Sequence, residues 1–111
     1  MEEELGSIRV SPQVVAAIIA LSAASVPGVA WLNARSGSQR RPLRIPEELG
    51  RAVRVDVEDG VVQADIYLTA ERNVSLMKLG KTVQQEVSEA ILRMLGLDVR
   101  AVNVYVVDIV R

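Results

Sequence analysis

The fold is decided by residues 53–70, which read VRVDVEDGVVQADIYLTA. Valines alternate with charged side chains over 53–58, a pattern typical of a strand that is buried on one face. The dipeptide Asp59-Gly60 favours a two-residue turn, and the alternation resumes beyond it as far as residue 69. The stretch therefore predicts a β-hairpin with one apolar and one polar face.

Two helices are expected, one before and one after this hairpin in the sequence. Ser11-Pro12 is a favoured helix start, and the helix that follows should run to about residue 24, before Pro27-Gly28 stops it. A second amphipathic helix should begin near Ser75 and end at Gly96, which supplies the left-handed residue of a helix terminus. Each helix should place an apolar face against the sheet.

Three further strands and a loop complete the expected order. Strands are predicted at 7–10, 28–32 and 99–110, and the alternation blurs near the end of the last one, which predicts burial of both its faces. Residues 34–50 hold prolines and glycines without a sustained period and predict a long basic loop, with one helical turn at 46–49. The order β-α-β-loop-β-β-α-β predicts an α+β fold for a single domain over 1–111, with two helices on one face of a mixed, largely antiparallel sheet.

The composition excludes most enzyme mechanisms. The chain of 111 residues has a formal net charge of −1 and contains neither cysteine nor histidine, so thiol chemistry and the commonest general base and transition-metal ligand are absent. The carboxylates around the hairpin lack the spacing of a calcium loop. We therefore expect no enzyme, no cofactor and no metal site, although an enzyme that works through carboxylates remains the least favoured of three hypotheses.

The first predicted helix has an unusual surface. No charged residue occurs from Val10 to Asn33, and the run Val14–Leu21 is apolar around the whole helix. Eight residues are too few to span a membrane, so a buried helix is expected. Its outer side must be covered by the long loop or by another subunit, and the second alternative predicts a homo-oligomer. The helical residues expected to bind a partner are Val14, Val15, Ile18 and Ile19.

The long loop carries a local positive charge. Arginines occur at four of its positions, Arg35, Arg40, Arg41 and Arg44. The first interpretation of these side chains is a solvated surface loop, and docking to a protein partner is the second. The alternative is a module that binds nucleic acid or a regulatory ligand. No aromatic residue lies among the arginines to stack on bases, so nucleic acid is the less favoured partner.

Taken together and in order, six segments of the chain resemble the bacterial alkaline-shock and Gls-type envelope stress response family. The resemblance covers nearly the whole sequence, and the segments that carry it are Gly6–Val15, Val26–Ala30, Val53–Gly60, Asp65–Leu68, Val83–Val87 and Gly96–Val106. Family members typically have a Tyr-Gly pair after the second hairpin strand, where this chain has residues 71–74, Glu-Arg-Asn-Val.

This resemblance implies a non-enzymatic role. Proteins of the family are cytoplasmic, are linked to cell-envelope stress, and in some cases are held at the membrane by a separate anchor protein. No secretory signal is indicated by the acidic amino terminus, which agrees with a cytoplasmic location. We therefore expect a cytoplasmic interaction or scaffold protein that self-associates, has no membrane span of its own, and docks to an envelope-associated or metabolic protein.

Overall fold

The computed structural model describes residues 5–34 and 50–111, which form two helices and a four-stranded sheet. Apart from residues 7–10, the strand and helix boundaries are close to those expected, and the α+β class is confirmed. In chain order the elements are α1 (Pro12–Ala24), β1 (Val29–Leu32), the 3-10 helix η1 (Gly50–Ala52), β2 (Val53–Glu58), β3 (Val61–Ala70), α3 (Leu76–Leu95) and β4 (Asp98–Ile109).

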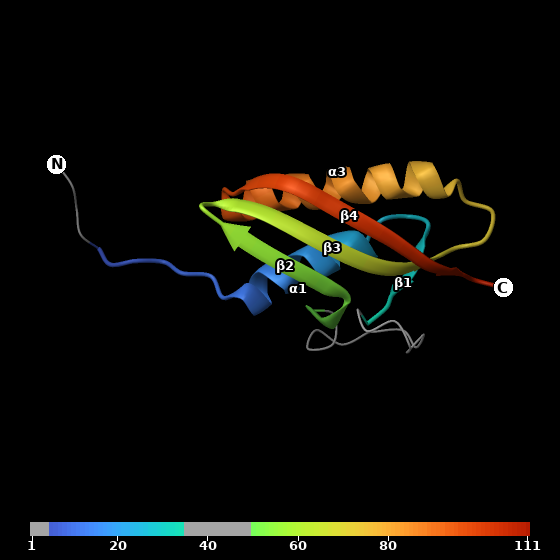
Figure 1. Ribbon diagram of the computed structural model, residues 1–111, viewed down its shortest axis with the longest axis horizontal. Helices are drawn as coiled ribbons and strands as arrows, with labels where there is room; N and C mark the ends of the chain where they lie inside the picture. Colours follow the sequence, from blue (N-terminus) through green and yellow to red (C-terminus); the bar gives the residue numbers. More distant parts are fainter. Residues whose placement is uncertain (1–4, 35–49) are drawn as a thin grey trace.

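Strand β3 is the centre of the sheet. It pairs in parallel with β4 along one edge, and in antiparallel fashion with β2 and then β1 along the other edge. The long diagonal ribbons of β3 and β4 run side by side in Figure 1. The sheet is therefore mixed, with two antiparallel pairings and one parallel pairing.

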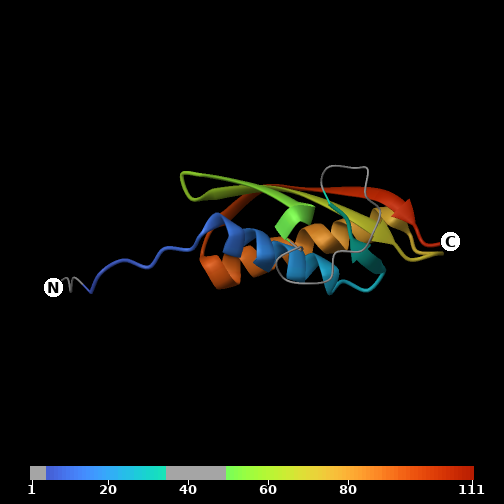
Figure 2. The same cartoon turned by 90° about the horizontal axis from the view of Figure 1, so that it is seen from below.

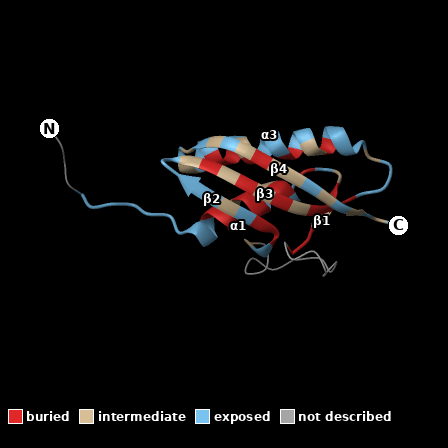
Figure 3. Ribbon diagram, in the orientation of Figure 1, coloured by how far each residue is buried: buried red, intermediate tan, exposed pale blue. Residues whose placement is uncertain are grey.

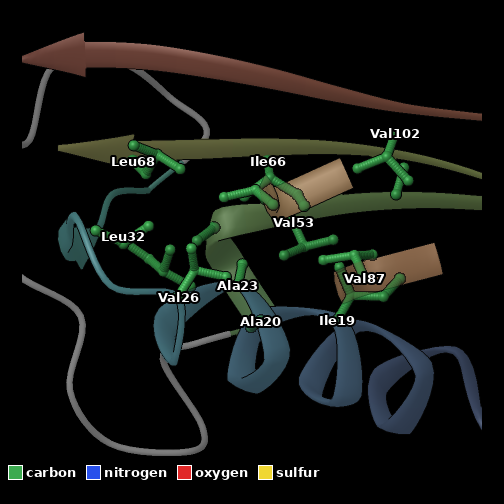
Figure 4. Close-up of a cluster of buried hydrophobic side chains, with 14 of the residues drawn as sticks. Ile19, Ala20, Ala23, Val26, Leu32, Val53, Ile66, Leu68, Val87 and Val102 are labelled. Atoms are coloured by element: carbon green, nitrogen blue, oxygen red, sulfur yellow. The ribbon is translucent and has the colours of Figure 1, made fainter. Parts of the chain in front are cut away.

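Both helices lie on the same face of the sheet (Figure 2). The even-numbered side chains of β3, from Val62 to Ala70, are buried beneath them. In the close-up of Figure 4, Ile19 of α1 lies beside Val87 of α3 and close to Val53 of β2. Buried residues are concentrated between the layers, whereas the outer helix surfaces and the hairpin tip are exposed (Figure 3). The core is thus formed by aliphatic side chains from both layers.

The hairpin turn has the geometry that its sequence predicts. Asp59 and Gly60 both adopt positive φ, at 53° and 75°, as a type I′ turn requires. Glu58 then lies opposite Val61, and the register continues without a bulge to the pair Val53 and Ile66. This register places the valines of β2 on the helix-covered face and its charged residues on the open face.

The helix ends also follow from local chemistry. The Ser11 hydroxyl accepts a hydrogen bond of 3.2 Å from the Val14 amide, and Pro12 occupies the first turn of α1. The Ser75 hydroxyl accepts a 3.3 Å bond from the Lys78 amide at the start of α3. That helix ends at Gly96, which is left-handed with φ 66°. These contacts satisfy backbone groups that a helix end leaves free.

Two expectations from the sequence are wrong, and a third cannot be compared. Residues 7–10 form no strand: they are extended and exposed, and no pairing with the described sheet exists. The carboxyl end of β4 is not buried on both faces, since Val107 and Ile109 are 43% and 42% exposed. Burial still alternates along this end of β4, so the apolar residues Val107 and Ile109 lie on its exposed side together with Tyr105. The turn expected at 46–49 lies outside the described residues.

A candidate interaction surface on the first helix

Helix α1 has two apolar faces, and only one of them meets the core. The buried face consists of Val15, Ala16, Ile19, Ala20 and Ala23. On the opposite side a second set of apolar residues follows the i, i+3, i+4, i+7 spacing of a helix face. We call this set the outer stripe; its members are Val14, Ala17, Ile18 and Leu21.

The outer stripe is open to solvent over much of its length. Val14 is 47% exposed and Leu21 is 52% exposed, while Ala17 and Ile18 are half-buried between them. A helix of a two-layer domain normally shows polar side chains on this side. The outer stripe is thus an apolar surface on a helix without any charged side chain.

The helical residues that the sequence predicts to bind a partner lie on two different faces of α1. Val14 and Ile18 belong to the outer stripe. Val15 and Ile19 are 4% and 0% exposed and belong to the core, so they are not available to a partner at this surface. The four arginines at positions 35, 40, 41 and 44 lie outside the described residues. Whether any of these residues binds a partner stays a prediction.

Polar residues border the outer stripe where α1 meets α3. A shallow hollow of about 200 Å³ lies between the helices, and Ser22 and Ser25 of α1 line it together with Glu86, Glu89 and Arg93 of α3. The two helices run next to each other in Figure 2. An apolar centre with a polar border is the usual composition of a protein–protein contact.

The three aromatic residues of the chain lie away from the core. The rings of Tyr67 on β3 and Tyr105 on β4 stack with centroids 4.8 Å apart and an angle of 11° between their planes. Trp31 of β1 is opposite Thr69, again on the sheet face that the helices leave open. Alternation along each strand predicted an outward side chain for both tyrosines, but their contact depends on the parallel register of β3 and β4, which no local pattern encodes.

Two buried polar residues lie beside this aromatic group. Asn33 and Thr69 are each 2% exposed, and the Thr69 hydroxyl donates a 2.9 Å hydrogen bond to the side-chain oxygen Oδ1 of Asn33. Within the part of the chain that the structure describes, the side-chain nitrogens Nδ2 of Asn33 and Nε1 of Trp31 have no hydrogen-bond partner. Sequence reasoning did not identify this pair, because a single Asn at a strand end gives no distinctive signal.

The carboxylates of the open sheet face do not form a metal site. Asp56 and Glu58 project from β2 on this face. The Asp65 carboxylate accepts a 2.8 Å hydrogen bond from the side-chain nitrogen of Asn103 on β4. Over residues 5–34 and 50–111 no three aspartates or glutamates are grouped closely enough to hold an ion. In the same ranges, no helix has the length and apolar character needed to cross a membrane.

Comparison with known proteins relates the whole chain to one family. Residues 1–111 match the sequence profile of the alkaline shock protein 23 family. That family is described as having a cell envelope-related function. The uncharacterized protein YqhY of Bacillus subtilis strain 168 is 28% identical over 110 residues, which cover 97% of this chain and 80% of that protein. The uncharacterized protein Spy1535 of Streptococcus pyogenes serotype M6 is 30% identical over 109 residues, 97% of this chain and 82% of its own length. No solved structure matches the chain.

Proposed function

The chain belongs to the alkaline shock protein 23 family, whose function is related to the cell envelope, and from this premise we propose that it acts as a non-enzymatic interaction protein that self-associates through the outer stripe of α1. The self-associated protein then docks to an envelope-associated or metabolic protein partner. It works in the cytoplasm and reaches the membrane through such a partner.

The observation that supports self-association is the exposure of the outer stripe. Val14 and Leu21 leave about half of their surface in water. Burial of apolar surface contributes roughly 25 cal/mol per Å². A contact that covers this stripe therefore stabilises the associated state, whereas the monomer gains nothing from exposing it.

A second copy of the chain suits this stripe better than a charged partner does. Because no charged residue occurs between Val10 and Asn33, two copies of α1 can approach each other without like-charge repulsion. Ala17 lies in the middle of the stripe, and a small residue there lets two helix backbones come close. A partner selected by charge would find no complementary group on this surface.

The test is the mass of the protein in solution. Light scattering on the eluting peak at micromolar concentration should give a mass above that of one chain, and Leu21→Glu should reduce it to the monomer because a carboxylate cannot be buried in an apolar contact. Leu92→Glu is the matched control, since Leu92 of α3 is 60% exposed and does not line the hollow beside α1. A monomeric mass for the unmodified chain, or equal masses for all three proteins, would contradict the proposal.

The alternative, a nucleic-acid-binding role, gains no support from the open sheet face. Stacked tyrosines on a sheet are one platform on which bases can stack. Here, however, Asp56, Glu58 and Asp65 occupy the same face and would repel phosphates. The arginines of 35–44 remain the only basis for that alternative, and its test is a steep salt dependence of RNA or DNA binding.

A further inference from the structure

The first residues that the structure describes form an exposed arm with apolar side chains. Residues 5–10, the arm, precede α1 and extend away from the body of the molecule in Figure 1. Ile8 is 97% exposed and Leu5 is 89% exposed, the two highest values among the large apolar residues described. Ile8 and Val10 alternate with Arg9, so the arm has the residue pattern of a strand but lacks a neighbouring strand.

Strand β2 offers an edge that no described strand occupies. It pairs with β3 along one side only, and β1 continues that same side of β3 instead of covering β2. Unpaired edges are the usual sites at which a strand from another chain is added. Val57, near the end of β2, is directed to the helix-covered face yet remains 48% exposed. The core is therefore incompletely covered at this end.

An apolar cavity lies where the arm joins the body. It has a volume of about 320 Å³, and its lining includes Val57 of β2, Val15 of α1, and Leu95 and Leu97 at the end of α3. Ile8 and Val10 of the arm line it as well. The root of the arm and the exposed end of β2 are thus next to each other, and the cavity accepts aliphatic side chains.

The arm and the edge of β2 match in both polarity and charge. If the arm lies beside β2, Ile8 and Val10 fall on the face of the valines and the cavity, because side chains alternate across a strand. Arg9 then falls on the open face, where β2 carries two carboxylates, Glu58 and Asp56, against one cation, Arg54, whose Nε lies 4.0 Å from Asp56. From this match we propose that the arm of a second copy adds to the outer edge of β2, so that two copies exchange their arms.

The geometry at the start of α1 favours exchange over folding back within one chain. Ser11 is extended, with φ −68° and ψ 152°, its hydroxyl caps the helix, and the following Pro12 disfavours any helical conformation at Ser11. In the single chain the arm does not pair with its own β2 and extends away from it (Figure 1). In a pair related by a two-fold axis, each arm instead begins beside the edge that receives the partner's arm.

This inference rests on the proposed self-association, which it extends to a second surface. The test uses a disulfide between two chains, which is clean because the protein contains no cysteine. One chain carries Arg9→Cys, and a second chain, distinguished by a tag of different size, carries Asp56→Cys or Glu58→Cys. A disulfide forms only between residues whose Cα atoms come within about 7 Å of each other. Glu71→Cys, at an exposed position after the far end of β3, replaces Asp56→Cys in the matched control.

We expect the mixed dimer with Asp56→Cys or Glu58→Cys to form at least tenfold faster than the one with Glu71→Cys. Adding Ile8→Asp to the Arg9→Cys chain should remove most of this advantage without affecting folding, because Ile8 is 97% exposed in a single chain. Equal rates for all pairs would overturn the exchange. So would a disulfide that forms within a single chain carrying both Arg9→Cys and Asp56→Cys.

The outcomes also separate this inference from the role of α1. If Leu21→Glu gives a monomer by light scattering and no preferential disulfide forms, the outer stripe is a contact between copies and arm exchange is wrong. If the disulfide forms preferentially and Leu21→Glu leaves the mass unchanged, arm exchange stands and the contact through α1 is wrong.

Discussion

Gly28 and Leu79 are in such close contact that a Cβ atom at position 28 would lie 3.0 Å from Leu79 Cδ1. Gly28 joins α1 to β1 and has a φ of +104°, a value that other residues rarely adopt. Leu79 is 5% exposed, in the first turns of α3. This contact fixes the loop after the first helix against the start of the second one.

The first prediction is that Gly28→Ala destabilises the protein by about 2–4 kcal/mol. Strain at positive φ contributes about 1–2 kcal/mol, and crowding against Leu79 adds a similar amount. Gly60→Ala is the control, since Gly60 also has a positive φ, +75°, but a Cβ there would meet nothing within 4 Å. Urea denaturation of the two variants should show the larger loss for Gly28→Ala, and equal losses would contradict the role of Leu79.

A second glycine should give the opposite result. Gly80 lies within α3, has no positive φ, and a Cβ at this position would meet nothing within 4 Å. Alanine restricts the unfolded chain and favours helix, so Gly80→Ala should raise the free energy of unfolding by about 0.5–1 kcal/mol. Thermal denaturation followed by circular dichroism measures this, and a lower melting temperature would show that Gly80 has a role that its surroundings do not reveal.

The elements whose signals are local could be predicted from the sequence. The β2–β3 hairpin, its Asp59-Gly60 turn and the caps at Ser11 and Ser75 all depend on residues a few positions apart, and the structure has them where they were expected. The fold class followed from these elements, because amphipathic helices and half-buried strands must cover each other.

Contacts between residues that are distant in the sequence could not be predicted from local patterns. The pattern at 7–10 indicates which side chains share a face, but it does not supply a neighbouring strand. On α1 every position after Gln13 is apolar or small, so periodicity could not separate buried Val15 from exposed Val14. Only the packing of the helix on the sheet distinguishes the two. Of the four helical residues predicted to bind a partner, Val15 and Ile19 therefore lie in the core, and partner binding by the outer stripe stays a prediction.

The third prediction concerns the buried pair of Asn33 and Thr69. Thr69→Val removes the hydroxyl that donates to the side-chain oxygen of Asn33 and leaves that buried oxygen unpaired. The free energy of unfolding should fall by about 1–3 kcal/mol. Asn33→Leu likewise leaves the hydroxyl unpaired. In the double variant both polar groups are gone, so it should lose less stability than the sum of the single variants. Losses that simply add would show that the hydrogen bond contributes nothing to stability.

The last prediction uses two neighbouring residues of α1 to separate folding from association. Ile19 is fully buried, so Ile19→Ala should leave a cavity and lower the free energy of unfolding by about 2–5 kcal/mol. Leu21 is 52% exposed, so Leu21→Ala should change the stability of a single chain by less than about 0.5 kcal/mol. Association adds stability that grows with protein concentration. The melting temperature of the unmodified protein and of Ile19→Ala should therefore rise between dilute and concentrated samples, while that of Leu21→Ala should rise much less. A rise of equal size in all three proteins would place the contact between copies away from the outer stripe.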